Sequence, residues 1–316
     1  LYFSILNTAE FDCVVLSNSD KIEDMEPEWV ANDEHLCAVV GSSIVGTKLR
    51  ACITGSSTAA SLGWSDFHYY SQQRGMQQID ALMHSRIANL FYAKYGRRDS
   101  QEQCGAGQHT NMRTTGGTAQ SKPLYLGKFE IRETEFPYGM TDTIGYEEAS
   151  GINPGVTNSL IDGLVHQYAW YKTNDEYGEP SVIQVNNICC LGYEDIFGHK
   201  YDMMDGVDLP NDSGNSGKWR IWMPDGTTRF VKGRTSSDQW TTAVAHGKFM
   251  DVVPVGSVNG SSSTYYCDKY YISTSSVRVV YRGYNNANAN GGVSNANANN
   301  DATNTNTNVG SRLEIK

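Results

Sequence analysis

A group of acidic residues with one histidine lies in the stretch YEDIFGHKYDMMDG, residues 193–206. Its carboxylates and its imidazole belong to Glu194, Asp195, His199, Asp202 and Asp205. Carboxylates and an imidazole can transfer protons as a general acid and base, and carboxylate oxygens are also the ligands that calcium prefers. Either chemistry requires these groups to share one cleft, which their spacing alone does not establish.

Asparagine recurs through residues 285–308, mostly at every second position, with Ala or Thr between. The asparagines of this run are Asn285, Asn286, Asn288, Asn290, Asn295, Asn297, Asn299, Asn300, Asn304, Asn306 and Asn308. An amide side chain both donates and accepts hydrogen bonds. In an extended segment, a period of two places such side chains on one face. The sequence therefore predicts a polar, hydrogen-bonding surface near the end of the chain.

Two interpretations of this run are open. Its polar composition buries little apolar surface and is typical of a disordered tail. However, the segments RVVYRGY before the run and VGSRLEI after it both have strand-like patterns, and two strands that bracket a loop usually pair with each other. Asn also favours turns and accepts unusual backbone angles. We therefore expect an ordered loop that displays its side chains.

The elements that would position these residues are one clear helix and many short strands. Apolar residues at three- and four-residue steps from Ile79 to Phe91 predict a helix that Gly96 ends. The segment KWRIWMPDGTTRFVKG, residues 218–233, has the pattern of a hairpin whose turn is PDG. Two short strands are expected within residues 36–54, and a loop without a phosphate-binding pattern over residues 104–122. A helical part followed by many strands predicts an α+β fold with irregular sheets.

Composition narrows the classes of partner. The chain has 316 residues and a formal net charge of −10, which argues against nucleic acid because phosphate binding relies on Lys and Arg. No apolar run is long enough for a membrane span, and no export signal is visible. The seven cysteines and seven histidines lack metal-binding spacing, so we expect reduced core thiols and no structural metal. The six tryptophans are interpreted as core and strand anchors rather than as a stacking platform for nucleic acid.

Several motifs occur in an order that resembles a known family. The stretch LGYEDIFGHKYDMMDG is followed by YRGY and then by VGSRL, and the helix GMQQIDALMHSRIANLFYAKYGRRDSQ precedes CGAG. Together these motifs span residues 64–316, and they resemble the variable proteins of diversity-generating retroelements, in particular members from gut bacteria and their phages. The resemblance implies a C-type lectin fold of the kind shared with formylglycine-generating enzymes. It divides the chain into residues 1–60, either an attachment segment or part of the core, and a lectin-like variable domain over residues 61–316.

The resemblance also implies a role for the asparagines. In that family, a template copy is reverse-transcribed with errors at adenines, so the AAC or AAT codons of Asn become mutable positions. The expected ligand-binding positions are Tyr284, Asn285, Asn286, Asn288, Asn290, Asn295, Asn297, Asn299, Asn300, Asn304 and Asn306. Asn308 is expected to be structural, and residues 309–313 are expected to stay constant as scaffold.

The resemblance further argues against catalysis. The enzymes of the wider superfamily use copper and cysteines placed shortly before the closing strand, and this chain has no cysteine after Cys267. In the family, the YEDIFGH stretch is a turn packed around buried aromatics, here Tyr193, Phe197 and Tyr201. The calcium-and-sugar triplets of animal lectins are not present. We therefore expect a protein that is not an enzyme, with no cofactor and no metal.

These inferences define an expected function. The chain is expected to bind a host cell-surface receptor, protein or glycan, at the tip of a phage tail fibre. The alternatives are a bacterial surface adhesin with the same domain and a structural virion protein whose Asn-rich loop packs against a neighbouring subunit. No nucleic acid and no membrane insertion are expected, and the tail-fibre setting suggests a homotrimer.

Overall fold

The structure is a computed structural model of the chain. It describes residues 41–50, 59, 61–104 and, with short gaps, 182–316, together with short stretches at 2–7, 12–17, 30–31, 36–38, 124–126, 129–131 and 165–171. The loop expected after Cys104 and the asparagines at 285, 286 and 288 lie outside the described residues. None of the described helices has the length and apolar character needed to cross a membrane.

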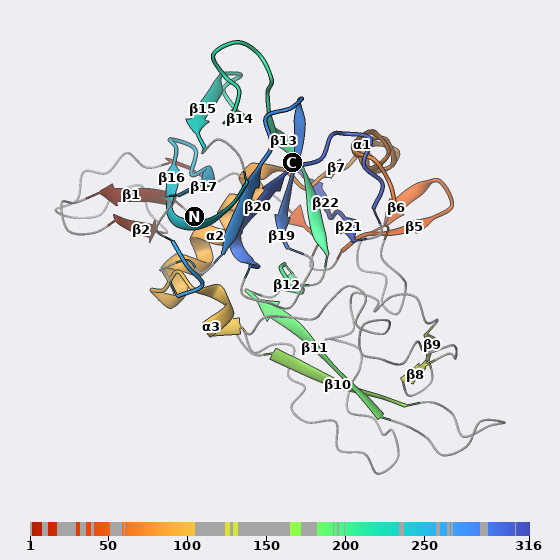
Figure 1. The fold of residues 1–316 in the computed structure, drawn as a ribbon. Coiled ribbons are helices and arrows are strands. Elements are labelled where there is room, and N and C mark those ends of the chain that lie inside the picture. Colours follow the sequence, from red (N-terminus) through yellow and green to blue (C-terminus); the bar gives the residue numbers. More distant parts are fainter. Residues whose placement is uncertain are drawn as a thin grey trace.

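The largest sheet of the described residues has nine strands and occupies the centre of Figure 1. Its main path runs in the order β15-β14-β13-β19-β20-β18-β16-β17, and β21 pairs with β13. The bounds are β13 Tyr201–Leu209, β14 Lys218–Trp222, β15 Thr228–Lys232, β16 Ser237–His246, β17 Val252–Gly256, β18 Lys269–Ile272, β19 Arg278–Gly283, β20 Gly292–Ala298 and β21 Val309–Gly310. Most pairs are antiparallel, but β18 with β20 and β13 with β21 are parallel.

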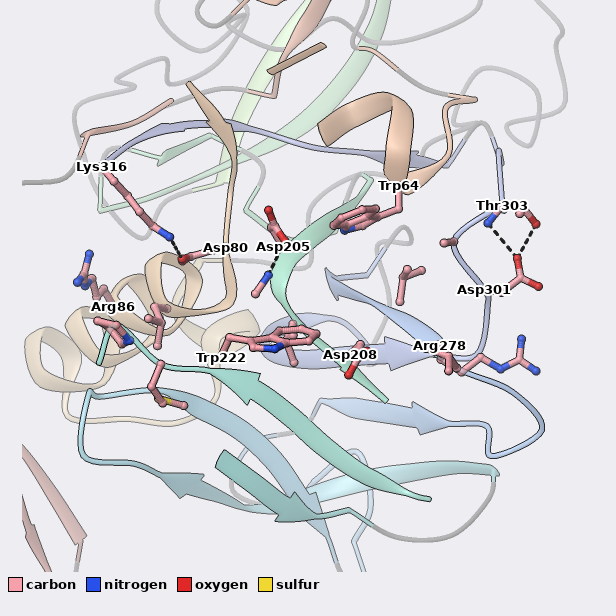
Figure 2. Close-up of a pocket in the computed structure, with 18 residues that line it drawn as sticks. Trp64, Asp80, Arg86, Asp205, Asp208, Trp222, Arg278, Asp301, Thr303 and Lys316 are labelled. Atoms are coloured by element: carbon pink, nitrogen blue, oxygen red, sulfur yellow. Dashed lines mark hydrogen bonds and ion pairs between the residues drawn. The ribbon is translucent and has the colours of Figure 1, made fainter. Parts of the chain in front are cut away.

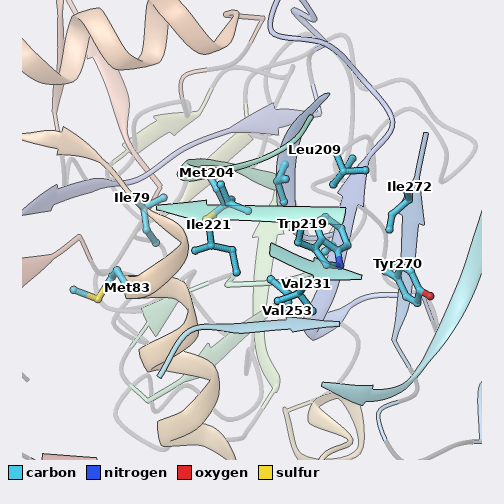
Figure 3. Close-up of a cluster of buried hydrophobic side chains, with 14 of the residues drawn as sticks. Ile79, Met83, Met204, Leu209, Trp219, Ile221, Val231, Val253, Tyr270 and Ile272 are labelled. Carbon is cyan, nitrogen blue, oxygen red and sulfur yellow. The ribbon is translucent and has the colours of Figure 1, made fainter. Parts of the chain in front are cut away.

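One side of this sheet holds the main core (Figure 3). Trp219 of β14 is fully buried there, and its indole Nε1 donates to the carbonyl of Pro254 at 3.0 Å. Ala296 and Ala298 of β20 are also fully buried in this core. Full burial of an aromatic side chain contributes on the order of 2–3 kcal/mol, and the indole hydrogen bond avoids the cost of an unpaired donor. The hairpin predicted over residues 218–233 is confirmed by the antiparallel β14–β15 pair.

Three helices lie within the described residues: α1 Trp64–Gln72, α2 Ala81–Tyr95 and α3 Ser100–Cys104. The predicted helix is confirmed as α2, which packs against β13, β17 and β20. Asp80 caps its N-terminus by accepting from the backbone N–H of Met83 at 2.7 Å. Gly96 ends it in the left-handed conformation at φ 60°.

The last strand of the sequence pairs with two strands from much earlier in the chain. Strand β22 Leu313–Ile315 lies between β4 Leu36–Cys37 and β7 Gln77–Gln78. Backbone bonds from Ala38 to Leu313 and from Ser42 to Ser311, both 2.9 Å, extend this contact. Leu49 and Ala59 are buried in the same cluster as Leu313. The described residues between 36 and 59 therefore share a core with the chain's last strand.

The remaining strands form smaller sheets. The bounds are β1 Tyr2–Asn7, β2 Asp12–Ser17, β3 Val30–Ala31, β5 Ser43–Val45, β6 Lys48–Arg50, β8 Leu124–Leu126, β9 Phe129–Ile131, β10 Val165–Tyr171, β11 Val182–Cys190 and β12 Tyr193–Glu194. Strands β1 to β3 form one sheet, β5 pairs with β6, and β8 to β12 form a five-stranded sheet in the lower part of Figure 1.

The predicted C-type lectin-like α+β fold is wrong. The structure is mostly β, its helices are few, and its main mixed sheet curls until it is nearly closed, which is not the lectin architecture. The prediction is based on short motifs, each of which describes only a local strand or turn. A fold is defined instead by which strands pair when they are far apart in the sequence. Part of the Asn-rich run forms a central strand, β20, between β19 and β18. The resemblance instead implied a variable loop throughout that run.

Candidate binding site

A groove of about 1100 Å³ lies where α1, the start of α2, the main sheet and the Asn-rich segment meet (Figure 2). Its lining is mostly apolar, with Val207, Met223 and Val279 among the contributing side chains. Trp64 and Trp222 also line it, as do several charged side chains. A concave, largely apolar site with a few polar groups is the usual form of a ligand-binding pocket.

An irregular stretch of β13 forms part of the lining of the groove. The pairing register between β13 and β19 shifts between Met203 and Asp208. Gly206 lies in this bulge at φ +68°, which a residue with a side chain adopts only with strain. A Cβ on Gly206 would also lie 3.5 Å from the Cβ of Asp80. The bulge brings both Asp205 and Asp208 into the lining of the groove.

Each of the two tryptophans has a neighbour that braces its ring. The imidazole of His68 stacks on Trp64 with ring centroids 4.8 Å apart and an interplanar angle of 15°. The guanidinium of Arg220 lies 5.0 Å from the ring centroid of Trp222. Trp64 is half-buried at the start of α1, whereas Trp222, at the end of β14, is 45% exposed. Each indole thus packs against a neighbouring side chain and also lines the groove.

Most of the charges around the groove are compensated. Asp80 pairs with Lys316 at 2.7 Å, and Asp205 lies 3.2 Å from Nδ1 of His68, which compensates its charge when the imidazole is protonated. Arg220 holds Asp208 with two nitrogens, one of them at 2.7 Å. Such pairing fixes the carboxylates in place and leaves the groove without a strong excess of either sign. Arg86 also lines the groove and has no ion-pair partner within the described parts of the chain.

The Asn-rich segment contributes one wall through the loop 299–306. Its backbone is anchored by three carbonyls: those of Asn300, Ala302 and Asn306 accept from the backbone N–H groups of Val279, Trp64 and Ser61 at 3.1, 3.0 and 3.3 Å. Gly63 permits this approach, because a Cβ there would lie 3.0 Å from the carbonyl oxygen of Ala302. The loop is therefore held to α1 and β19 by its main chain.

The side chains of this loop are largely free to face solvent. Asp301, Ala302, Thr303, Thr305 and Asn306 are exposed, and Asn299, Asn300 and Asn304 are half-buried. Oδ1 of Asp301 accepts from the backbone N–H and the hydroxyl of Thr303, at 2.9 and 2.5 Å. The pKa of Asp301 is lowered mainly by these hydrogen bonds, so the side chain stays ionised. Asp301, Ala302 and Thr303 line the groove.

Two predicted binding positions lie instead inside the sheet. Asn295 and Asn297 point to the same face of β20, as the alternation requires, opposite to Ala296 and Ala298. Asn295 is only 2% exposed, and its amide donates to the carbonyls of Lys269 and Asn290 at 2.7 and 2.8 Å. Asn297 is half-buried, donating to the hydroxyl of Tyr201 at 3.0 Å and accepting from the backbone N–H of Asn299 at 3.0 Å.

The other predicted positions lie before and after this strand. Tyr284 packs at the edge of the second core cluster, with its ring 5.5 Å from that of Tyr201 and its hydroxyl bonded to the amide of Asn290 at 3.0 Å. The carbonyl of Asn308 accepts from the backbone N–H of Tyr201 at 3.0 Å. Of the described residues of the Asn-rich run, only Asp301, Ala302 and Thr303 line the groove, and the predicted asparagines at 299, 300, 304 and 306 lie beside them in the loop without lining it.

The acidic and histidine residues of the YEDIFGH stretch do not form one described cluster. Asp202 is buried and bonded to Nε of Arg312 at 2.7 Å, whereas Asp205, on the same strand, lines the groove. Burial raises the pKa of Asp202, and the Arg312 guanidinium opposes that rise. Asp195 and His199 lie outside the described residues. Within the described parts of the chain, no group of three or more His, Cys, Asp or Glu side chains is placed to hold a metal ion.

The interpretation of the tryptophans as anchors missed two site residues. Trp219 is a core anchor, but Trp64 and Trp222 line the groove. The hairpin pattern contained a signal for Trp222, because alternation from the apolar Trp219 and Ile221 places Trp222 on the opposite face. No protein-family model and no curated protein matches this chain. The site is therefore interpreted from its own geometry.

Proposed function

We propose that this chain is a non-catalytic recognition protein that binds a receptor on a cell surface through the loop 299–306 and the adjoining groove. The observation that carries the proposal is the construction of the loop. Three backbone carbonyls anchor it to α1 and β19, while five of its side chains are exposed. These three bonds use backbone atoms only, so substitution of the exposed side chains would not remove them, as a recognition loop requires.

The composition of the loop supports a variable surface. Asn299, Asn300, Asn304 and Asn306 belong to the periodic run, and errors at the adenines of Asn codons would reach most residue types at these positions. The proposal of retroelement diversification rests on this pattern of asparagines, not on the fold. The predicted lectin fold has no part in it.

The proposed setting is the tip of a phage tail fibre, with a bacterial surface adhesin as the alternative. In a homotrimeric fibre, several copies of a weak site would act together and raise the overall affinity by roughly 10²–10⁴. A structural virion protein is the third candidate, in which the same loop would pack against a neighbouring subunit.

The aspartates that line the groove already have partners within the protein, and this supports a binding role rather than a catalytic one. Asp80, Asp205 and Asp208 each have a basic partner, and Asp80 also caps a helix. A general acid or base needs a proton to exchange with the substrate and a pKa suited to that exchange. Side chains held in ion pairs are better suited to fixing the shape and charge of a binding groove.

Binding to whole cells would test this proposal. The labelled chain should bind a subset of a panel of gut anaerobic bacteria in flow cytometry. Replacing Asn299, Asn300, Asn304 and Asn306 together by Ala should abolish binding or change which cells are bound. The matched control carries Ala at Asn211 and Ser213, two exposed positions in another turn, and should bind like the unmodified chain. Equal binding by both variants, or no binding to any cell, would contradict the proposal.

A further inference from the structure

The two tryptophans give the groove a specific chemical preference. Trp64 from α1 and Trp222 from β14 are far apart in the sequence but line the same groove (Figure 2). His68 and Arg220 each brace one of these rings, so the indoles are held before any ligand arrives. The face of an aromatic ring carries partial negative charge and attracts the polarised C–H groups of a flat ligand. Preorganised platforms of this kind suit a ligand that stacks through C–H groups.

Hydrogen-bonding groups border these platforms. Asp205 lines the groove, and its carboxylate is paired with His68. His68 is also the residue that stacks on Trp64. Asp208 is held by Arg220, the same residue that braces Trp222. Asp301 uses Oδ1 for its bonds to Thr303, which leaves Oδ2 to accept from a ligand. A carboxylate has about four acceptor sites, so even a paired one can accept from a hydroxyl group.

The balance of charge selects against several ligand classes. The lining carries Asp80, Asp205, Asp208 and Asp301 against Arg86, Arg278 and Lys316, with His68 and Arg220 behind it. A phosphate-rich ligand would need an excess of cations, and a strongly basic ligand would need unpaired acids. The balance fits an uncharged ligand that is apolar on its ring faces and rich in hydroxyl groups at its edges.

We propose that the groove is a calcium-independent site for a neutral oligosaccharide, with Trp64 and Trp222 as stacking platforms and Asp205 and Asp301 as hydroxyl acceptors. The ligand class deepens the proposed function and rests on it, because the glycan would be the part of the cell surface that is recognised. Pyranose rings carry C–H groups on their faces and hydroxyls around their rims. Asp301, Ala302 and Thr303 form one wall of the groove, and the asparagines on either side of them would alter the rim past which the glycan extends.

The test uses native affinity electrophoresis in gels that contain a soluble neutral polysaccharide. The panel should include an α-glucan, a β-glucan, a mannan, a galactan and a xylan, with EDTA in all gels. At least one should retard the chain, and Trp222→Ala should weaken that retardation at least about tenfold, the size expected for loss of a central aromatic contact. Phe230→Ala is the matched control, because Phe230 is a 41% exposed aromatic of the same hairpin that does not line the groove.

A second measurement locates the sugar. Binding of the retarding polysaccharide should protect tryptophan fluorescence from acrylamide quenching in the unmodified chain and in Phe230→Ala, but less in Trp222→Ala. Both substitutions are at exposed positions, so matching thermal melts should show that the variants are folded. Asp301→Ala should weaken retardation while the melt stays cooperative, with a small shift from loss of its bonds to Thr303.

The outcomes separate this inference from the proposed function. Retardation by no polysaccharide, or equal retardation of Trp222→Ala and the unmodified chain, would overturn the saccharide site. If loop-dependent binding to cells persisted in that case, the proposed function would stand and its ligand would be of another class, such as an apolar peptide. If cell binding were absent as well, both proposals would fail.

Discussion

Two neighbouring segments of the Asn-rich run have opposite surroundings in this protein. In strand β20, Gly292–Ala298, Asn295 is 2% exposed and bonded to two backbone carbonyls. In the loop 299–306, Asn306 is exposed and backbone carbonyls hold the loop to its neighbours. Asparagine at every second position, with Ala between in the strand and Thr in the loop, therefore supports either a central strand or a displayed loop. The neighbouring strands decide between these outcomes, because β20 pairs with both β18 and β19, whereas the loop keeps one backbone bond to β19, at Asn300.

This difference limits what a variable surface could include. Substitution at Asn295 would remove donors from inside the sheet, whereas substitution at Asn304 or Asn306 would alter only a surface. If the run is diversified, tolerance should change sharply at the end of β20. Substitutions on either side of that boundary, and near the closing strand beyond it, should therefore differ in their effect on stability.

The largest effect is expected at the closing end of the chain. Arg312 is fully buried and its guanidinium pairs with the buried Asp202. Arg312→Ala leaves that carboxylate without its partner and should lower the free energy of unfolding by about 3–5 kcal/mol. Chemical denaturation measures this loss. Arg74→Ala, at an exposed position, is the control and should change stability by less than about 0.5 kcal/mol. Equal effects of the two changes would contradict the assignment of this strand as scaffold.

A pH-dependent effect is expected two residues further on. Burial and, next, the negative charge of Asp80 raise the pKa of Glu314 from 4.5 to about 7. Because the pKa is higher in the folded state, the stabilising contribution is complete below pH 4.5 and is lost as the pH rises through 7. The unfolding free energy of the unmodified chain, relative to that of Glu314→Gln, should fall by up to about 3 kcal/mol across this window. If the unfolding free energies of the unmodified chain and of Glu314→Gln changed in parallel with pH, this expectation would be contradicted.

A smaller loss is expected inside β20. Asn295→Ala removes the donors to the carbonyls of Lys269 and Asn290, each net bond contributing about 1 kcal/mol, for a total loss of about 2 kcal/mol. Urea unfolding checks the value. Stability unchanged within error would mean that Asn295 is as replaceable as the asparagines of the loop, and the boundary at the end of β20 would disappear.

The smallest effect is expected in the loop itself. Asn306→Ala, at an exposed position, should change the free energy of unfolding by less than about 0.5 kcal/mol. Asn304→Ala removes an acceptor for the backbone N–H of Asn306 and should cost no more than about 1 kcal/mol. Thermal melting of the double variant would show a cooperative transition close to that of the unmodified chain. A drop as large as that expected for Asn295→Ala would assign the loop a structural role.

Local elements could be predicted from the sequence, but long-range pairing could not. Periodicity from Ile79 to Phe91 predicted α2, and PDG between two alternating segments predicted the β14–β15 hairpin, because both depend on neighbouring residues. The lectin fold was inferred from the order of short motifs, which does not determine that β20 pairs in parallel with β18. Nothing near Asn295 in the sequence distinguishes it from Asn304, since its burial depends on carbonyls from Lys269 and Asn290. The groove likewise joins Trp64 and Trp222 only through the fold.

The most direct test of the central claim is deep sequencing of the codons for residues 285–313 across a natural population of this gene. A variable recognition loop predicts substitutions concentrated at the adenines of the codons for Asn299, Asn300, Asn304 and Asn306. Asn295 should vary less than these positions, and Arg312 should be constant. Uniform sequence, or changes spread evenly over all bases and equally over Asn295 and Asn304, would contradict the account.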